Sequence, residues 1–285
     1  MTILARTNIA STALTIFLLG VLTAALNQTH SGSGLPNARL IAYHFDVGQA
    51  DATLIRSHGC NILIDAGHWN RDDMKQHLLD AAVDEIDIMV LTHPHADHIG
   101  QADAVLSKYA VHEVWASGWE HDSQTFERTI DAISVSGASY EEPRAGYTEQ
   151  CGTMMLQVIH PVDVPEQIHD NLAVRIHHRH AVLLYTGDAE ADHERDMIQR
   201  EDSLEADWLH LGHHGSRTSS SPEFLDAVDP AGAIYSADED NQFGHPHDEV
   251  VRRAADRDIA LYGTAEHGTV MLVADGEGLH IRTHQ

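Results

Sequence analysis

The sequence predicts a mixed α/β fold in which two packed β-sheets are flanked by helices. Short apolar segments bounded by tight turns indicate many short strands, and longer segments between them have helical patterns. This mixture occurs twice, once in each half of the 285-residue chain, which is long enough for an ample core. Each half can bury its sheet against the other and keep its helices outside.

The expected elements follow in chain order. Strands are predicted at residues 40–45, 52–56, 61–64, 86–91, 111–115, 154–159, 172–177, 181–185, 207–211, 232–236, 259–262 and 269–273. Helices are predicted at residues 71–82, 97–109, 122–134, 190–200, 222–228 and 248–256. Glycine-containing turns at residues 47–49 and 57–59 join the first three strands into a meander.

The charge balance is strongly acidic. The chain has 44 acidic and 17 basic residues, a formal net charge of −27. Such a surface repels nucleic acid and anionic membranes at low salt. It also suits concentrated salt, where the Debye length falls to roughly 3 Å at 1 M, and we favour a halophilic source. The two cysteines, Cys60 and Cys151, can form at most one bridge, and their pairing is left open.

The N-terminus differs from the rest of the chain. An apolar run at about residues 9–26 follows Arg6, and its length lies between that of a signal-peptide core and that of a minimal membrane helix. We expect residues 1–26 to be a signal peptide or an N-terminal membrane anchor, residues 27–37 a linker, and residues 38–285 the main domain. That domain is expected outside the cytoplasm, extracellular or membrane-anchored.

The most informative stretch is LTHPHADHIG at residues 91–100, directly after an expected strand. The strand can aim His93 and His95 at one point, while Asp97 and His98, at the start of the next helix, face a second point. Imidazole and carboxylate are the ligands that zinc and its neighbours prefer. Clusters arise by chance in a chain with 24 histidines, but this spacing favours a metal site.

Three later strands also end in residues of ligand type: His160, Asp188, and the pair His213 and His214. Strand ends at one edge of a sandwich converge, so these residues are expected to meet the first cluster. The first metal would take His93, His95 and His160. The second would take Asp97, His98 and His213, with Asp188 bridging the two. Such a pair of metals generates a shared hydroxide at neutral pH, and Asp65 would orient a ligand or hold the loop.

Together these residues resemble the metallo-β-lactamase superfamily. The closer resemblance is to the C-terminal hydrolase domain of the ComEC family of DNA-internalisation competence proteins. It rests on FDVGQADA (45–52), DNLAV (170–174), GHHGSRTSS (212–220) and NQFGHP (241–246), and it spans about residues 40–273. One departure is His95, where the ComEC-like pattern often has Asp.

The resemblance implies a four-layer αββα sandwich, with the hydrolase domain at residues 38–285. It further implies one or two divalent metals, with Zn favoured and Mn or Fe as alternatives. The candidate catalytic residues are Asp97, Ser216 and His245: Ser216 and Arg217 would hold a phosphate, and His245 would contact or protonate the leaving oxygen. Residues expected to support the ligands or contact the substrate are Asp46, Asp65, Asn171, His214 and Arg217.

The leading functional hypothesis is an exported metal-dependent phosphodiesterase or nuclease acting on DNA. One alternative is a metallo-hydrolase of a β-lactam, lactone or thioester, whose carbonyl a metal would polarise, or of phosphocholine-type esters. Another is a non-catalytic metal-binding module of a DNA-uptake machine. Membrane contact is expected through residues 1–26 if they are retained, and no protein partner is predictable.

Overall fold

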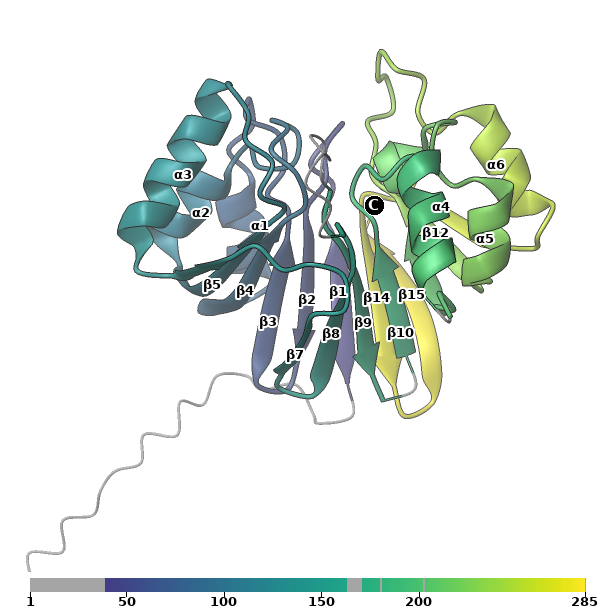
Figure 1. Cartoon of the computed structure of the whole chain (residues 1–285), viewed down its shortest axis with the longest axis horizontal. Helices are drawn as coiled ribbons and strands as arrows, with labels where there is room; N and C mark the ends of the chain where they lie inside the picture. Colours follow the sequence, from purple (N-terminus) through teal and green to yellow (C-terminus); the bar gives the residue numbers. More distant parts are fainter. Residues whose placement is uncertain (1–38, 163–170, 180, 202, 285) are drawn as a thin grey trace, which may run out of the picture. The chain divides into compact units, whose positions relative to one another are not determined.

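The computed structural model describes residues 39–162, 171–179, 181–201 and 203–284 (Figure 1). The expected leader (1–26) and linker (27–37) lie outside these residues. Within the described ranges, none of the helices combines the length and the apolar character needed to span a membrane.

Two sheets form the centre of the domain. The first has the strand order β15-β14-β1-β2-β3-β4-β5-β6 and the second the order β13-β12-β11-β10-β9-β8-β7. The strands of the first sheet are β1 (Leu40–His44), β2 (Thr53–Ser57), β3 (Cys60–Ile64), β4 (Glu85–Leu91), β5 (Ala110–Ala116), β6 (Ser139–Glu141), β14 (Thr269–Asp275) and β15 (Gly278–His284). Those of the second are β7 (Thr148–Cys151), β8 (Met154–His160), β9 (Ala173–His178), β10 (Ala181–Tyr185), β11 (Trp208–His210), β12 (Gly232–Tyr235) and β13 (Ala260–Gly263).

Helices lie on the outer faces of both sheets (Figure 1). Beside the first sheet lie α1 (Met74–Asp80), α2 (Ala102–Lys108) and α3 (Gln124–Ser136). Beside the second lie α4 (Ala191–Arg200), α5 (Pro222–Val228) and α6 (Asp248–Ala255). Two short helical turns, η1 (Gly212–Gly215) and α7 (Thr264–His267), follow strands β11 and β13.

Three apolar clusters hold these four layers together. Because successive side chains of a strand point to opposite faces, Leu54 of β2 packs toward the helices of the first sheet, while Ile55 packs between the sheets. On the other side, Leu184 of β10 packs with Phe224 of α5. The expected αββα sandwich is therefore confirmed.

The helix expected from residue 97 begins later, at Ala102. The backbone before Ala102 forms hydrogen bonds with a neighbouring loop: the His98 carbonyl accepts the Ala66 amide at 2.6 Å, and the Gly100 amide donates to the Gly67 carbonyl at 2.9 Å. Asp97 and His98 therefore lie in turns whose shape the neighbouring loop determines. The prediction also missed β6, β7, β15 and α7.

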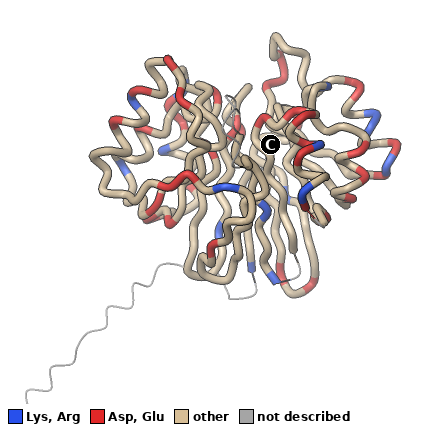
Figure 2. Tube along the Cα trace, in the orientation of Figure 1, with Lys and Arg blue, Asp and Glu red and all other residues tan. Residues whose placement is uncertain are grey.

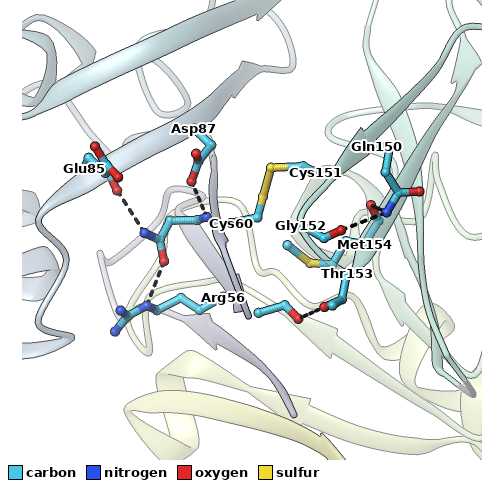
Figure 3. Close-up of a disulfide and its surroundings, with 11 residues drawn as sticks. Arg56, Cys60, Glu85, Asp87, Gln150, Cys151, Gly152, Thr153 and Met154 are labelled. Carbon is cyan, nitrogen blue, oxygen red and sulfur yellow. Dashed lines mark hydrogen bonds between the residues drawn. A yellow bond between two sulfur atoms is a disulfide. The ribbon is translucent and has the colours of Figure 1, made fainter. Parts of the chain in front are cut away.

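Cys60 and Cys151 form a disulfide that joins β3 of the first sheet to β7 of the second, with their Cα atoms 5.5 Å apart (Figure 3). Polar contacts surround it. Asp87 accepts the amide of Asn61 at 2.7 Å, and Gln150 donates to the carbonyl of Gly152 at 3.0 Å. The bridge ties the two sheets together covalently.

Candidate metal centre

The loop after β4 carries the histidine-rich stretch. Buried His93 has its Nε2 atom 2.9 Å from Nδ1 of His95 and 3.4 Å from Oδ2 of Asp188. The ligand atoms of these three residues all lie within 4.8 Å of one another. We call His93, His95 and Asp188 the first ligand group.

Asp188 reaches this loop from the end of β10. Its other oxygen, Oδ1, lies 3.2 Å from Nε2 of His98. Asp51, His98, Asp188 and His214 also present ligand atoms within 4.8 Å of one another, and we call them the second ligand group. One carboxylate therefore belongs to both groups.

The structure separates the two adjacent histidines. His214 is buried, and its Nε2 atom lies 3.5 Å from Oδ2 of Asp97. His213 is about one-third exposed and lies 3.7 Å from Asp188 and 3.2 Å from Glu190. The geometry therefore places His214, where His213 was expected, in the second ligand group. Asp97 is not a member of this group but lies next to it, because its carboxylate is close to His214.

Side chains behind the ligands fix their orientation. Asp65 accepts hydrogen bonds from the amide and the hydroxyl of Thr92 at 2.8 and 2.7 Å, and it lies 2.8 Å from Nδ1 of His98. Asn171 accepts the amide of Asp188 at 2.9 Å. A Cβ atom on Gly187 would lie 2.4 Å from the Asn171 oxygen, so this close approach requires glycine.

His160 lies at the end of β8 but outside both ligand groups. Its Nδ1 atom contacts the Asn171 carbonyl at 2.6 Å, which assigns the ring proton to Nδ1. The Nε2 atom is buried and has no hydrogen-bond partner among the described residues. Burial lowers the pKa of this ring to about 4.

Charge pairing dominates the electrostatics of the second ligand group. Burial opposes ionisation of Asp188, but His98 and His93 outweigh it and hold its pKa well below the usual range. Burial also opposes the charged form of His214, but Asp51 and Asp97 outweigh it and raise its pKa to about 10. Acidic and basic groups here compensate one another.

Orphaned buried atoms test whether this set fits a metal. His98 Nε2, His214 Nε2 and Asp188 Oδ1 are buried and, although each lies near an oppositely charged side chain, none makes a hydrogen bond of normal geometry in the described part of the chain. Buried polar atoms are normally satisfied, and exceptions need an explanation. A divalent cation ligated by these nitrogen and oxygen atoms would satisfy them. The donor set fits a metal.

Loops from both sheets surround the centre. Gln49 lies 3.2 Å from Nδ1 of His245, whose ring centroid is 6.1 Å from that of His214. Asp46 accepts the amide of Gly48 at 3.3 Å in the loop that carries Gln49. His245 therefore borders the second ligand group.

Ser216 and Arg217, the expected phosphate contacts, have other surroundings. The buried Ser216 hydroxyl lies 3.0 Å from that of Thr218. The exposed Arg217 donates its amide to His247 at 3.1 Å. Neither residue lines the cavities that flank the centre.

Two cavities flank the centre, and only one of them is lined by members of a ligand group. A cavity of about 790 Å³ is lined by His93, His95 and Asp188, together with Trp119. Another, of about 510 Å³, is lined by Asp97, with Arg71 and Phe243. A substrate in the larger cavity would reach the first ligand group directly, whereas one in the smaller cavity would lie beside Asp97, a neighbour of His214.

Asp51 is the principal residue that the sequence prediction did not assign. It lies in FDVGQADA, and its amide donates to the Asp97 carbonyl at 3.1 Å. His210 of β11 lies 3.4 Å from its carboxylate. Asp51 could have been proposed from its place in the FDVGQADA motif. His210 could have been proposed because it ends the strand that precedes His213 and His214.

Two curated relatives match most of this chain. ComE operon protein 3 of Bacillus subtilis is 27% identical over 250 residues, 79% of this chain and 32% of the relative. Recombination protein 2 of Haemophilus influenzae is 30% identical over 238 residues, 79% of this chain and 28% of the relative. The chain thus spans about 30% of the length of these two relatives.

A solved structure shares the fold. The metallo-beta-lactamase fold protein YhfI from Bacillus subtilis superposes with a TM-score of 0.52 at 14% identity, covering 79% of this chain and 95% of that one. The sequence profile of the Metallo-beta-lactamase superfamily matches residues 45–237. This fold binds divalent metals, and most of its members are hydrolases. The chain belongs to the metallo-β-lactamase superfamily, and its curated relatives are ComEC-like competence proteins.

Proposed function

We propose that this protein is an exported metal-dependent phosphodiesterase that acts on DNA. The shared position of Asp188 carries the proposal: one of its oxygens lies 3.2 Å from His98 and the other 3.4 Å from His93. A carboxylate shared by two histidine-containing ligand groups suits a two-metal hydrolytic site.

The proposed ligands follow the two groups. One cation is held by His93, His95 and Asp188, and the second by Asp51, His98, Asp188 and His214. Zinc is the favoured ion because imidazole and carboxylate suit it, and manganese and iron accept the same set. When bound, the cations supply Lewis acidity and a nucleophile at neutral pH.

His245 has a separate role in this proposal. Gln49 donates to its Nδ1 atom, which leaves the ring proton on Nε2. Burial lowers the pKa of His245 to about 4, and the neighbouring His214 and His213 add to this effect. The ring is therefore neutral at pH 7, and its Nε2–H group can donate a hydrogen bond to a substrate oxygen.

The substrate and the location rest on further observations. The relatives are ComEC-like competence proteins, and one of them is named Recombination protein 2, which favours DNA as the substrate. A disulfide between the sheets favours an oxidising compartment, since disulfides persist there. The apolar run at residues 9–26 gives the means of export.

The test is hydrolysis by the purified chain with added zinc or manganese, at low and at molar salt. Single-stranded DNA, duplex DNA and bis(p-nitrophenyl) phosphate are compared with nitrocefin. Asp188→Asn should lower phosphodiester hydrolysis at least about 100-fold, because even partners outside the ligand shell cost 10–100-fold. Asp84→Asn is the matched control, because Asp84 is exposed just before β4, at the end opposite the centre.

Cleavage of DNA that is lost in Asp188→Asn and kept in Asp84→Asn supports the proposal. Turnover of nitrocefin with no phosphodiester cut would move the assignment to a carbonyl substrate. Metal-loaded protein that is inactive on every phosphodiester overturns the proposed function.

A further inference from the structure

The 510 Å³ cavity beside Asp97 lies next to the second ligand group but contains none of its members. It is lined by four loops, at residues 47–49, 68–71, 96–97 and 238–243. Asp97 connects it to the centre, because its Oδ2 atom lies 3.5 Å from Nε2 of His214. The volume is in the range of small-molecule sites.

One wall of the cavity presents an aromatic ring. Phe243 is 55% exposed, and its ring stacks beside His245 with centroids 5.7 Å apart. Asn241 holds this loop: its side-chain oxygen accepts the amides of Phe243 and His245 at 3.2 and 2.9 Å, and its amide group donates to the Asp238 carbonyl at 2.8 Å. These hydrogen bonds therefore hold the Phe243 side chain in a solvent-exposed position.

The cavity lining also contains a cation. Arg71 is the one Lys or Arg among the described residues that line this cavity. A Cβ atom on Gly48 would lie 2.9 Å from its guanidinium, and Gly48 has a φ of +75°, so glycine leaves the room that Arg71 uses. Asp73 forms an ion pair with Nε of Arg71. A guanidinium so placed can contact a phosphate.

We propose that this cavity binds one unpaired nucleotide of the substrate strand, with its base on Phe243 and a phosphate beside Arg71. This inference rests on the proposed function and narrows its substrate to single-stranded nucleic acid. Base stacking on an aromatic ring does not depend on a basic surface. Duplex binding needs several phosphate contacts from Lys and Arg, which a chain of net charge −27 with one cation in this cavity does not offer.

The test separates the base from the phosphate. The full chain, loaded with zinc or manganese, is given oligothymidylate or an oligomer of abasic tetrahydrofuran phosphates of the same length and charge. The natural chain should show a kcat/KM at least about tenfold higher for oligothymidylate, as expected for loss of one stacked base. Phe243→Ala should remove this preference and Phe243→Trp should retain it.

Two further variants sharpen the result. Arg71→Gln should lower kcat/KM on both oligomers by the same factor, because both contain phosphate. Tyr140→Ala removes an exposed aromatic ring that lines neither cavity, so it should keep the natural preference. Absence of a preference in the natural chain, or its persistence in Phe243→Ala, overturns the nucleotide site while hydrolysis itself still supports the phosphodiesterase. Failure to cut either oligomer and bis(p-nitrophenyl) phosphate overturns the proposed function instead.

Discussion

His213 and His214 are adjacent in the chain but lie in different surroundings. Both have positive φ, at 52° and 55°, within one tight turn. His214 is 2% exposed and faces Asp51 and Asp97, whereas the side chain of His213 is 34% exposed. The pair therefore offers a matched comparison of two neighbouring imidazoles.

We expect His214→Ala to lose one equivalent of bound metal and at least about 100-fold in hydrolysis of bis(p-nitrophenyl) phosphate. His213→Ala should keep both equivalents and lose about tenfold, the lower end of the range for a partner outside the ligand shell, because His213 belongs to neither group and lies 3.7 Å from Asp188. Metal content after dialysis and steady-state kinetics measure the two effects. Loss of metal in His213→Ala with full loading in His214→Ala would reverse the assignment.

For single residues, the sequence predicts which ligands group together when they are close in the chain, but it does so less well when only folding brings them together. His93, His95 and His98 follow one strand, so local spacing sufficed to group them. The choice between His213 and His214 depends on backbone angles that the sequence does not encode locally. Asp51 depends on a loop contact with Asp97, 46 positions along the chain, so its place among the ligand-type residues required the fold.

At the level of secondary structure, the positions of most strands were predictable from the sequence, but which strands pair with one another was not. Both faces of β2 are buried, so successive side chains enter different apolar clusters: Leu54 packs toward the helices and Ile55 packs between the sheets. The start of α2 at Ala102 was missed because the turn before it bonds to residues 66 and 67. Pairing of Cys60 with Cys151 was left open because it requires β3 and β7, which belong to different sheets, to lie face to face.

This disulfide should stabilise the stacking of the two sheets (Figure 3). Its cysteines are 91 positions apart, so it restricts a long loop in the unfolded chain. Cys60→Ser with Cys151→Ser should lower the free energy of unfolding by about 2–5 kcal/mol. Urea unfolding with and without reductant measures this. Reductant should lower the midpoint of the natural chain and leave that of the double variant unchanged; equal midpoints for the natural chain in both conditions would show that the bridge contributes nothing.

For the whole molecule, the net charge of −27 follows directly from the sequence. The fold by itself gives no reason for so many acidic residues. Asp and Glu residues are spread over the helices of both outer layers (Figure 2). Exposed residues such as Asp131 and Asp256 are not part of the core, whereas Glu194 of α4 is buried and accepts the amides of Ser220 and Ser221. The number of acidic residues makes sense as a response to the solvent, because repulsion among like charges destabilises a compact chain at low salt and is screened at high salt.

We therefore propose that the protein is adapted to concentrated salt, and its stability should depend on ionic strength. Raising KCl from about 0.1 M to about 2 M shortens the Debye length from about 10 Å to below 3 Å. The melting temperature should rise by about 5 °C or more, which for a domain of this size corresponds to roughly 1–2 kcal/mol. Replacing the exposed Asp84, Asp131 and Asp256 by Lys should reduce this rise, because fewer like charges then remain to be screened. Thermal unfolding of both proteins across the KCl series measures the difference. A melting temperature that is flat or falls with KCl would remove the halophilic interpretation, and an equal rise in both proteins would assign the effect to salting-out and not to charge.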